Sequence, residues 1–310
     1  MALDRRARRF LDFLAASARG RDGAPSLDDL RRASADLAAF AGPASPVERR
    51  DERVGDGEGG LALRIYSPLG SSGAPLPALV YFHGGGWVSG SLETHDPICA
   101  ALAARGGCRI VSASYRLAPE LRFPAALDDA LAAVRAVRAN PGRFGVDPLR
   151  LGVGGDSAGA NLAVAAARAL RGGEPPLALQ LLLCPVMEPL GRTPSRSEFA
   201  SGYLIEEATM RRYWDHYRVD GLAPDDLRVA PLRANDLAGM PSALIHTAEF
   251  DPLRDEGELY AQALAGHGVA AQLTRHVGMI HHFYGLGGVI PAAEAAVARI
   301  GEGLRVAWRS

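Results

Sequence analysis

Apolar residues recur along the chain in short runs that alternate with stretches of helical spacing. The short runs predict strands over residues 61–66, 78–82, 109–114, 149–153, 179–184, 243–247 and 271–276. The stretches between and after them predict helices over residues 96–105, 124–139, 161–170, 255–267 and 291–308. Strands that alternate with helices build a sheet wrapped by helices, so the pattern predicts an α/β fold with a mostly parallel central sheet. Residues 61–66 alternate apolar and polar side chains, which favours a half-buried edge strand.

Two stretches depart from this alternation. Residues 1–45 show helical spacing and no strand pattern, and Ser26, followed three residues later by Asp29, resembles a capping box. Residues 187–229 carry large aromatic and apolar side chains among charged ones. We expect both stretches to stand apart from the sheet.

Composition and charge describe an ordinary globular chain. Of 310 residues, 48% are hydrophobic and 22% are charged. The formal net charge of -1 gives no electrostatic case for nucleic acid or an anionic membrane surface as a partner. No apolar run approaches the roughly 20 residues that span a bilayer, and the basic N-terminus leads into no apolar signal core. We therefore expect no membrane association and a cytoplasmic location.

The basic residues and cysteines narrow the chemistry. All 34 basic residues are arginine, so no lysine can form a Schiff base or pair with a catalytic serine. Cys99, Cys108 and Cys184 are an odd set without metal-ligand spacing. We interpret them as reduced, small hydrophobic residues and expect no metal site.

The run Gly-Asp-Ser-Ala-Gly at residues 155–159 lies between a predicted strand and an alanine-rich predicted helix. A G-x-S-x-G run at such a turn is typical of the nucleophile elbow, whose small flanking residues let the backbone turn sharply and expose the serine hydroxyl. The helix directs its N–H groups and positive dipole end toward the group that the hydroxyl attacks. A chance Gly-Ser-Gly turn is the alternative, and the position between strand and helix argues against it. Ser157 is the candidate nucleophile.

Three consecutive glycines, Gly84, Gly85 and Gly86, follow the apolar run 79–82. Such a run loses backbone entropy that an ordinary loop need not lose, unless main-chain N–H groups must approach a substrate closely. An oxyanion hole has that requirement, and its second part is the N–H after the nucleophile, here on Ala158. A phosphate-binding loop is excluded because no Gly-Lys-Ser/Thr follows.

A serine hydroxyl needs a base to take its proton and an acid to orient that base, and in this arrangement they follow in the order serine, acid, histidine. Asp251 comes directly after a predicted strand, at the end where α/β sheets gather ligands, whereas Asp255 and Glu256 fall at a helix start. Of eight histidines, His281 and His282 lie in the loop after the last predicted strand. The others are interpreted as loop-shaping (His83), surface or packing (His95, His216, His267) and strand residues (His246, His276).

These motifs together resemble one family, the hormone-sensitive-lipase-like esterases (bacterial family IV) of the α/β-hydrolase superfamily. The resemblance rests on the segments 83–87, 115–120, 123–129, 155–159 and 251–255, together with His281. It implies an α/β-hydrolase fold in which residues 46–310 form the catalytic domain. Residues 1–45 and the insertion 187–229 would form a helical cap over the site. The chain departs from the family at His282, where the family usually has glycine.

The resemblance and the motifs imply a carboxylesterase that needs no cofactor and acts on short- to medium-chain acyl esters. Ser157 would attack the acyl carbon, His281 would move the proton and Asp251 would orient His281. Gly85, Gly86 and Ala158 would hold the oxyanion, with Gly84 shaping the turn. We expect the substrate pocket to be lined by Trp87, Tyr203, Met210, Trp214 and His282.

Two other functions use the same fold. An amidase or deacetylase would apply the same residues to an acylated amine. A receptor for a small molecule would lack the catalytic histidine, and the presence of all three triad candidates argues against it. The expected partner is a small-molecule ester, and the candidate surfaces for a homodimer are an edge strand and the final helix.

Overall fold

One sheet organises the part of the chain that the computed structural model describes, which is residues 2–17, 25–55, 60–71 and 73–309. Its eight strands lie in the order β1-β2-β4-β3-β5-β6-β7-β8. Their bounds are β1 (Val47–Val54), β2 (Leu61–Pro68), β3 (Leu76–Phe82), β4 (Arg109–Ala113), β5 (Val146–Asp156), β6 (Leu179–Leu183), β7 (Ser242–Phe250) and β8 (Ala271–Ile280). Strands β3 to β8 run parallel, while β1 and β2 are antiparallel to their neighbours. The predicted α/β fold with a mostly parallel sheet is confirmed.

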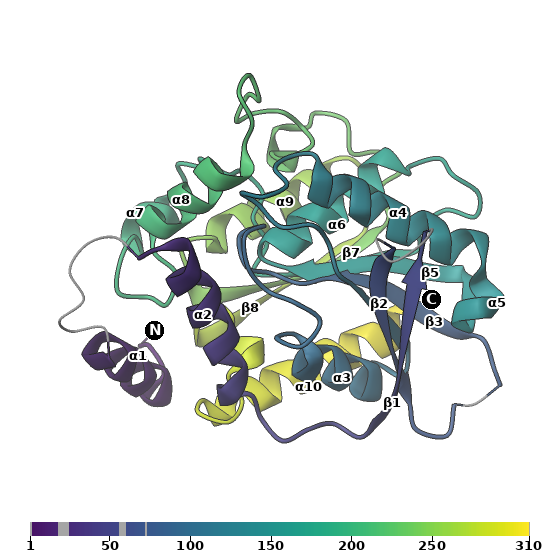
Figure 1. Cartoon of the computed structure of the whole chain (residues 1–310), viewed down its shortest axis with the longest axis horizontal. Coiled ribbons are helices and arrows are strands. Elements are labelled where there is room, and N and C mark those ends of the chain that lie inside the picture. The colour runs from purple at the N-terminus through teal and green to yellow at the C-terminus, as the bar shows by residue number, and fades with distance from the viewer. Residues whose placement is uncertain (1, 18–24, 56–59, 72, 310) are drawn as a thin grey trace.

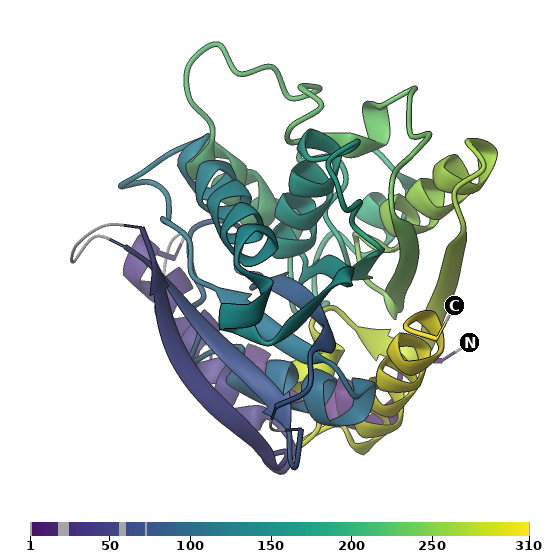
Figure 2. The ribbon, with the colours of Figure 1, turned by 90° about the vertical axis from the view of Figure 1, so that its right-hand side faces the viewer.

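Helices cover both faces of this sheet, as Figures 1 and 2 show. One face carries α3 (Asp96–Gly106) and α10 (Pro291–Ala307), and the other carries α4 (Ala125–Ala139), α6 (Ala158–Ala169) and α9 (Arg254–Gly266). The short α5 (Pro141–Phe144) and the 3-10 turns η1 (Ala38–Phe40), η2 (Pro231–Arg233) and η3 (Phe283–Gly285) complete the connections. No helix within the described ranges combines the length and the apolar character needed to cross a membrane.

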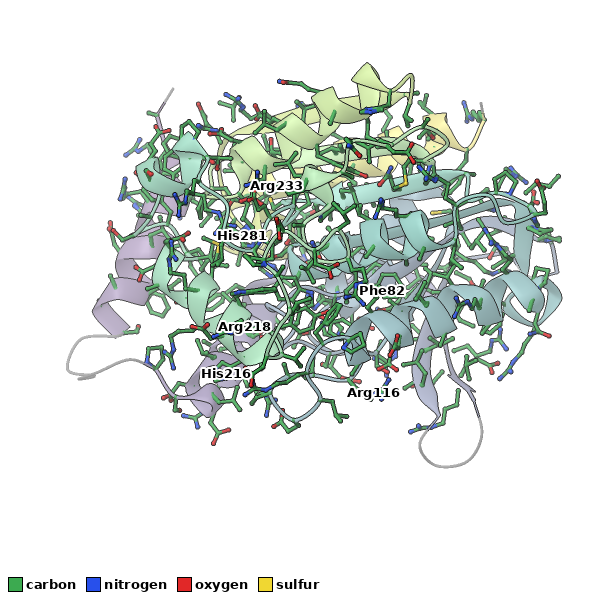
Figure 3. The ribbon with its side chains drawn as sticks, turned by 90° about the horizontal axis from the view of Figure 1, so that it is seen from above. Phe82, Arg116, His216, Arg218, Arg233 and His281 are labelled. Atoms are coloured by element: carbon green, nitrogen blue, oxygen red, sulfur yellow. The ribbon has the colours of Figure 1, made fainter. Side chains whose placement is uncertain are left out.

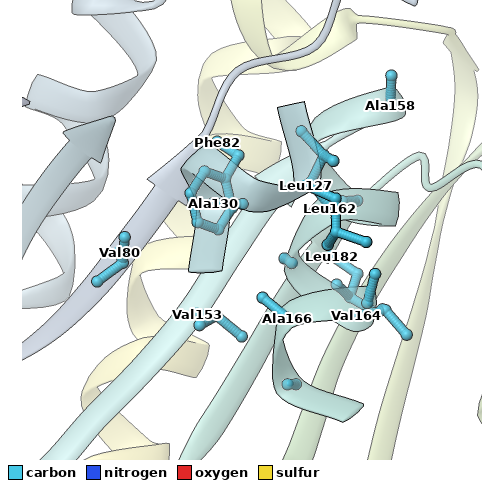
Figure 4. Packing of buried hydrophobic residues seen from close by; sticks show 14 of the residues in the cluster. Val80, Phe82, Leu127, Ala130, Val153, Ala158, Leu162, Val164, Ala166 and Leu182 are labelled. Carbon is cyan, nitrogen blue, oxygen red and sulfur yellow. The ribbon is translucent and has the colours of Figure 1, made fainter. Parts of the chain in front are cut away.

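Alanine-rich helix faces let α4 and α6 lie close to the sheet. Figure 4 shows Ala130 of α4 and Ala166 of α6 near Phe82 of β3 and Leu182 of β6, all four fully buried. Close packing of this kind removes apolar surface from water, and each fully buried large apolar side chain contributes about 1.5–3 kcal/mol. This core fixes the ends of β3, β5 and β6 relative to one another.

The strand at one edge of the sheet differs from the edge strand that the pattern predicted. β2 lies between β1 and β4, so the expected edge strand is an interior strand. The missed edge strand β1 is mostly polar, and its exposed side chains pair with neighbours, as in the hydrogen bonds from Arg64 to Asp51 and from Arg49 to Asp96. A charged edge strand has no apolar alternation to reveal it, because its side chains face water.

Helices form in both stretches that depart from the strand–helix alternation. They are α1 (Arg5–Ser17) and α2 (Leu27–Leu37) before the sheet, and α7 (Pro194–Glu198) and α8 (Glu207–Tyr217) after β6. The capping box predicted at Ser26 and Asp29 is present at the start of α2. Figure 1 shows α2 and α8 on the same side of the sheet.

Hydrogen bonds and ion pairs attach these helices to the main body, one of them partly exposed and one buried. Arg31 of α2 donates to the Val88 carbonyl oxygen at 3.0 Å and to the Glu120 carboxylate at 2.8 Å. Arg196 of α7 and Glu256 of α9 are both buried and form an ion pair at 2.7 Å. Removing one partner of such a buried pair costs about 3–5 kcal/mol, so α7 is held firmly against α9.

Two histidines are buried side by side on β7 and β8. His246 Nδ1 lies 3.1 Å from His276 Nε2, and the two residues are 3% and 4% exposed. Burial, together with the neighbouring His276 and Arg299, lowers the pKa of His246 to about 3. Burial and Arg299 likewise lower the pKa of His276 to about 4. Both rings are therefore neutral in the folded protein at neutral pH.

Acidification should destabilise the fold through this histidine pair. An unfolded histidine has a pKa near about 6.5, so below that pH the unfolded chain binds protons that the folded chain excludes. The stabilisation is complete above about pH 6.5 and is lost as the pH falls toward the folded pKa values. At about pH 5 the loss amounts to up to about 2 kcal/mol of unfolding free energy per histidine. We expect the melting temperature to fall less steeply with acid in His246→Gln than in the wild type.

The control for this measurement is His267→Gln, which removes an exposed ring at the end of α9. This variant should not flatten the dependence of melting temperature on pH. Equal slopes for the wild type and His246→Gln would contradict the assignment of acid sensitivity to the buried pair.

Candidate active site

The turn between β5 and α6 presents Ser157 at the carboxyl end of the sheet. Its φ of 52° and ψ of -119° form a sharp turn in a backbone conformation that residues with a side chain rarely adopt. Gly155 and Gly159 make the turn fit, since a Cβ on Gly159 would overlap the Phe82 carbonyl oxygen. The predicted elbow is therefore present, with α6 starting directly after Ser157.

Asp251 and His281 follow the ends of β7 and β8, at the same edge of the sheet. His281 Nδ1 lies 2.7 Å from Asp251 Oδ2, and the Leu253 N–H donates to Asp251 Oδ1 at 2.8 Å. Asp251 is fully buried. Burial lowers the pKa of His281, but the adjoining carboxylate more than offsets this, so the pKa of His281 is raised above its ordinary value. Figure 3 labels His281 in the loop after β8 and His216 on α8, well separated along the chain.

The glycine loop after β3 has backbone donors without a partner in the described part of the chain, at two glycines that line the pocket. The N–H groups of Gly85 and Gly86 donate to no acceptor among the described residues, whereas the Gly84 N–H donates to Asp156 Oδ1 at 3.1 Å. Gly85 has a φ of 114° and Gly86 a φ of 63°, which favour glycine. The N–H of Ala158 lies in the first turn of α6, where backbone donors have no helical partner. The glycine loop and the first turn of α6 therefore both hold N–H groups that are available to an acceptor.

A pocket of about 430 Å³ brings these groups together. It is lined by Ser157, His281, Gly85, Gly86 and His282 from the main body. Apolar and small residues of the helical segments complete it, among them Leu14, Leu30, Leu37, Phe40, Leu204, Ile205, Thr209 and Tyr213. Residues from both predicted cap segments therefore border the cavity that contains Ser157.

Four residues predicted to line this pocket lie elsewhere, and the prediction for them is corrected. Trp87 stacks on Tyr217 with ring centroids 4.5 Å apart, and Tyr203 packs against aromatic rings near the end of β7. Met210 and Trp214 are buried in the main core. Of the predicted set, His282 alone borders the pocket.

The way α8 is rotated about its own axis explains why Met210 and Trp214 were wrongly predicted to line the pocket. Met210, Trp214 and Tyr217 follow the helical repeat and face the core. Thr209 and Tyr213 lie on the adjacent face and border the pocket. The sequence identified a helix rich in aromatic residues, but large side chains suit the core and the pocket equally.

Comparisons with known proteins agree with this arrangement. The family described as alpha/beta hydrolase fold matches residues 79–285. Carboxylesterase NlhH of Mycobacterium tuberculosis is 40% identical over 261 residues, which cover 82% of this chain and 81% of that protein. Ethyl acetate hydrolase of Pseudomonas putida is 38% identical over 248 residues, covering 79% and 78%.

Solved structures are similar over nearly the whole chain. An ester hydrolase from the metagenome of Lake Arreo has a TM-score of 0.93 at 37% identity, covering 99% of this chain and 100% of that one. A thermostable esterase of Pseudomonas putida has a TM-score of 0.90 at 35% identity, covering 98% and 97%. The chain belongs to the α/β-hydrolase family. The resemblance to the hormone-sensitive-lipase-like enzymes is thereby confirmed.

Asp156, the residue before the nucleophile, is a functional residue that the motif did not reveal. Tyr81 Oη and the Gly84 N–H donate to its Oδ1 at 2.8 and 3.1 Å, and Tyr284 Oη donates to its Oδ2 at 2.9 Å. Its Oδ2 also lies 3.2 Å from His95 Nε2. Although burial opposes ionisation, His95 and these donors hold the pKa of Asp156 below its ordinary value. Asp156 thus ties the elbow of this α/β hydrolase to its glycine loop.

The surface or packing role expected for His95 is therefore incomplete, because His95 is buried against Asp156. His83 is buried as well, with its Nδ1 2.8 Å from the Gly84 carbonyl oxygen, so it contacts the glycine loop as predicted. Asp255 and Glu256 do more than lie at the start of a helix. Asp255 accepts from the Ser195 N–H, and Glu256 pairs with Arg196.

Cys184 is a second residue whose position the sequence did not reveal. It follows β6 with a φ of 43°, and its thiol is 1% exposed and hydrogen-bonded to Asp251. Burial raises the pKa of this thiol, and the carboxylate raises it further, so the sulfur keeps its proton and donates it. Asp251 therefore has three donors, from Leu253, His281 and Cys184. A cysteine at the end of an apolar strand gives no sequence signal for this contact.

Replacing Cys184 should leave the Asp251 carboxylate less firmly positioned beside His281. In Cys184→Ala the carboxylate loses one donor, a hydrogen bond worth about 0.5–1.5 kcal/mol, so we expect kcat/KM to fall by about 2- to 10-fold. The carboxylate then attracts the protonated His281 more strongly, so the acid limb of the pH profile should move to higher pH. Kinetics on ester substrates across a pH series measure both effects.

Cys184→Ser is the matched variant, because it keeps a donor. It should retain more activity than Cys184→Ala and show a smaller shift of the acid limb. Identical pH profiles for the two variants would contradict a role for the thiol hydrogen bond.

Proposed function

We propose that this α/β hydrolase is a carboxylesterase that acts through an acyl-enzyme on Ser157. The observation that carries the proposal is the 2.7 Å contact between His281 Nδ1 and Asp251, with His281 and Ser157 on one pocket. Asp251 occupies Nδ1, so His281 Nε2 is the ring atom that remains for the serine hydroxyl. The esterase relatives support the same activity.

Hydrolysis proceeds in two steps on this arrangement. His281 Nε2 takes the Ser157 proton as the serine oxygen attacks the ester carbonyl carbon, and the imidazolium then protonates the leaving alcohol. Water attacks the acyl-enzyme with His281 again as the base, releasing the carboxylic acid. Gly85, Gly86 and Ala158 donate their N–H groups to the oxyanion in both steps, a contribution of about 2.7–4 kcal/mol per donor. The proposed mechanism uses no cofactor.

The charge of His281 sets the pH dependence of the proposed esterase activity. Only the neutral ring accepts a proton, and the pKa of His281 is raised by Asp251. Activity should therefore be present above the raised pKa of His281 and be lost as the pH falls through it.

Ser157→Ala and His281→Ala should each abolish turnover while the fold survives. Loss of a triad member in serine hydrolases lowers kcat by about a million-fold, leaving catalysis from binding and the oxyanion hole. Initial rates on p-nitrophenyl acetate, with melting temperature as the folding check, measure the effect. His267→Ala, on the exposed end of α9, is the control and should keep full activity. A folded and active Ser157→Ala protein would falsify the mechanism.

The pocket favours short- to medium-chain acyl groups. Its volume of about 430 Å³ is bounded by residues that include Leu30, Leu37, Phe40 and Tyr213. Each methylene that enters such a cavity gains about 0.8 kcal/mol until the chain meets a wall, and further methylenes then clash or remain in water. Phe40 also lines a second, shallow groove with Phe10 and Phe13, so its ring separates the pocket from this groove.

Activity on p-nitrophenyl esters should peak between acetyl and hexanoyl and fall for longer chains. Phe40→Ala should move the optimum to longer chains, because it opens the wall toward the groove. Phe13→Ala, which alters only the groove side and removes a ring that is 54% exposed, should leave the optimum unchanged. Higher activity of the wild type on emulsified long-chain triglycerides would show that the pocket is not closed and that the enzyme is a lipase.

A further inference from the structure

His95, Asp156 and His282 meet at the wall of the pocket, on the side of the glycine loop. One ligand atom from each lies within 4.8 Å of the others. His95 precedes α3, Asp156 ends β5 and His282 follows β8, so three separate segments hold the cluster. All three residues border the same pocket as Ser157. The cluster is therefore preorganised and can be reached by a small ion.

The contacts of His95 place its Nε2 beside the Asp156 carboxylate. Thr94 Oγ1 lies 3.0 Å from the Ser91 carbonyl oxygen and 2.8 Å from His95 Nδ1, so Nδ1 carries the proton whenever the Thr94 hydroxyl donates its one hydrogen to that carbonyl oxygen. The Gly84 N–H also points at His95 Nε2, at 3.2 Å. In that tautomer of the neutral ring, the Nε2 lone pair faces Asp156 Oδ2 at 3.2 Å. A cation between these two atoms, either a second proton on Nε2 or a metal ion, would then be bound by both.

We propose that His95, Asp156 and His282 form a binding site for a divalent transition metal of the zinc class. Two imidazole nitrogens and one carboxylate are a donor set that zinc prefers, with a fourth position open to the pocket. For an ion about 2.0–2.1 Å from both Nε2 and Oδ2, the Nε2–metal–Oδ2 angle would be about 100°, close to a tetrahedral angle. The Nδ1 contact to Thr94 supplies the outer hydrogen bond that orients a ligating histidine.

The Asp156 carboxylate has an acceptor position left for the ion. Its Oδ1 accepts from Tyr81 and Gly84, and its Oδ2 accepts from Tyr284. A carboxylate oxygen has two acceptor positions, so one position on Oδ2 remains for the ion on the side of His95.

A rival cluster exists at Cys184, Asp251 and His281, which also lie within 4.8 Å of one another. There the Asp251 and His281 atoms already bond each other at 2.7 Å, and neither Cys184 nor Asp251 borders the pocket. An ion would have to break that contact and cross packed protein to bind. The His95 cluster is favoured because the pocket gives direct access to it.

An ion at this site inhibits hydrolysis. Asp156 holds the Gly84 N–H, so a metal on this carboxylate draws charge away from the contact that shapes the glycine loop. The ion also occupies the pocket beside Ser157. The inhibitory effect rests on the proposed esterase function, whereas the binding of zinc does not.

The test is zinc binding to the full chain after removal of adventitious metal, measured by competition with a chromophoric chelator. We expect one zinc ion per chain, with affinity at least about tenfold weaker in His282→Gly, since even residues that only orient a ligand contribute about 10- to 100-fold. His95→Gln should weaken binding as well and guards against a folding defect in one variant. Cys184→Ala, the matched variant at the rival cluster, should bind zinc as the wild type does.

Cobalt and kinetics complete the test. Co²⁺ bound at the proposed site should show visible bands of a low-coordinate ion without thiolate charge transfer, and zinc should inhibit hydrolysis over the range in which it binds. No stoichiometric binding, or binding lost in Cys184→Ala and kept in His282→Gly, would overturn the site. Tight binding without inhibition would overturn the inhibitory role alone, and an esterase-inactive protein that binds zinc would overturn the proposed function but not the site.

Discussion

The buried carboxylate of Asp156 is the interaction on which the site geometry depends. It joins the end of β5 to β3 through Tyr81, to the glycine loop through Gly84 and to the loop after β8 through Tyr284. Each donor comes from a different segment, so the elbow cannot move independently of the glycine loop. A buried charge is tolerated when it is paired and hydrogen-bonded, and here the same hydrogen bonds also align the site.

Parallel strands explain why residues far apart in sequence meet. β5, β7 and β8 point the same way, so the residues that follow them, Ser157, Asp251 and His281, emerge at one edge of the sheet. The helical segments lie beyond that edge and border the cavity. The main body therefore supplies the chemistry, and α2 and α8 supply much of the pocket wall.

The sequence predicted what depends on local pattern. The elbow at Ser157, the capping box at Ser26 and the interior strands all follow from short-range spacing, and the structure contains them. The roles assigned to Ser157, Asp251 and His281 stay predictions, supported by their geometry. Edge strand β1 escaped prediction because charged side chains that face water leave no apolar alternation.

The pocket wall and the contacts of buried polar groups could not be predicted, because they depend on how separate segments pack. Trp214 and Tyr213 are adjacent aromatic residues of one helix, yet the first packs in the core and the second borders the pocket. The partners of Asp156 and Cys184 come from strands and loops that no local pattern connects.

Backbone strain gathers where the chemistry is proposed. In the described part of the chain, the non-glycine residues with positive φ are Trp87, Ser157, Cys184, Leu204 and His282. Ser157, Leu204 and His282 border the pocket, Trp87 follows the glycine loop, and Cys184 contacts Asp251. Such conformations cost about 1–3 kcal/mol each and persist only where the surrounding structure imposes them.

His282 is the informative case among these strained residues. Its φ of 59° suits the glycine that the family usually has, so a histidine there carries a backbone cost that glycine avoids. Burial also lowers the pKa of His282 to about 3, so its ring stays neutral beside the ionised Asp156. The ring packs edge-on against His95 and Tyr284, two residues that contact Asp156, and it also borders the pocket. A glycine at this position would lose both ring contacts and leave the Asp156 side of the pocket without this wall.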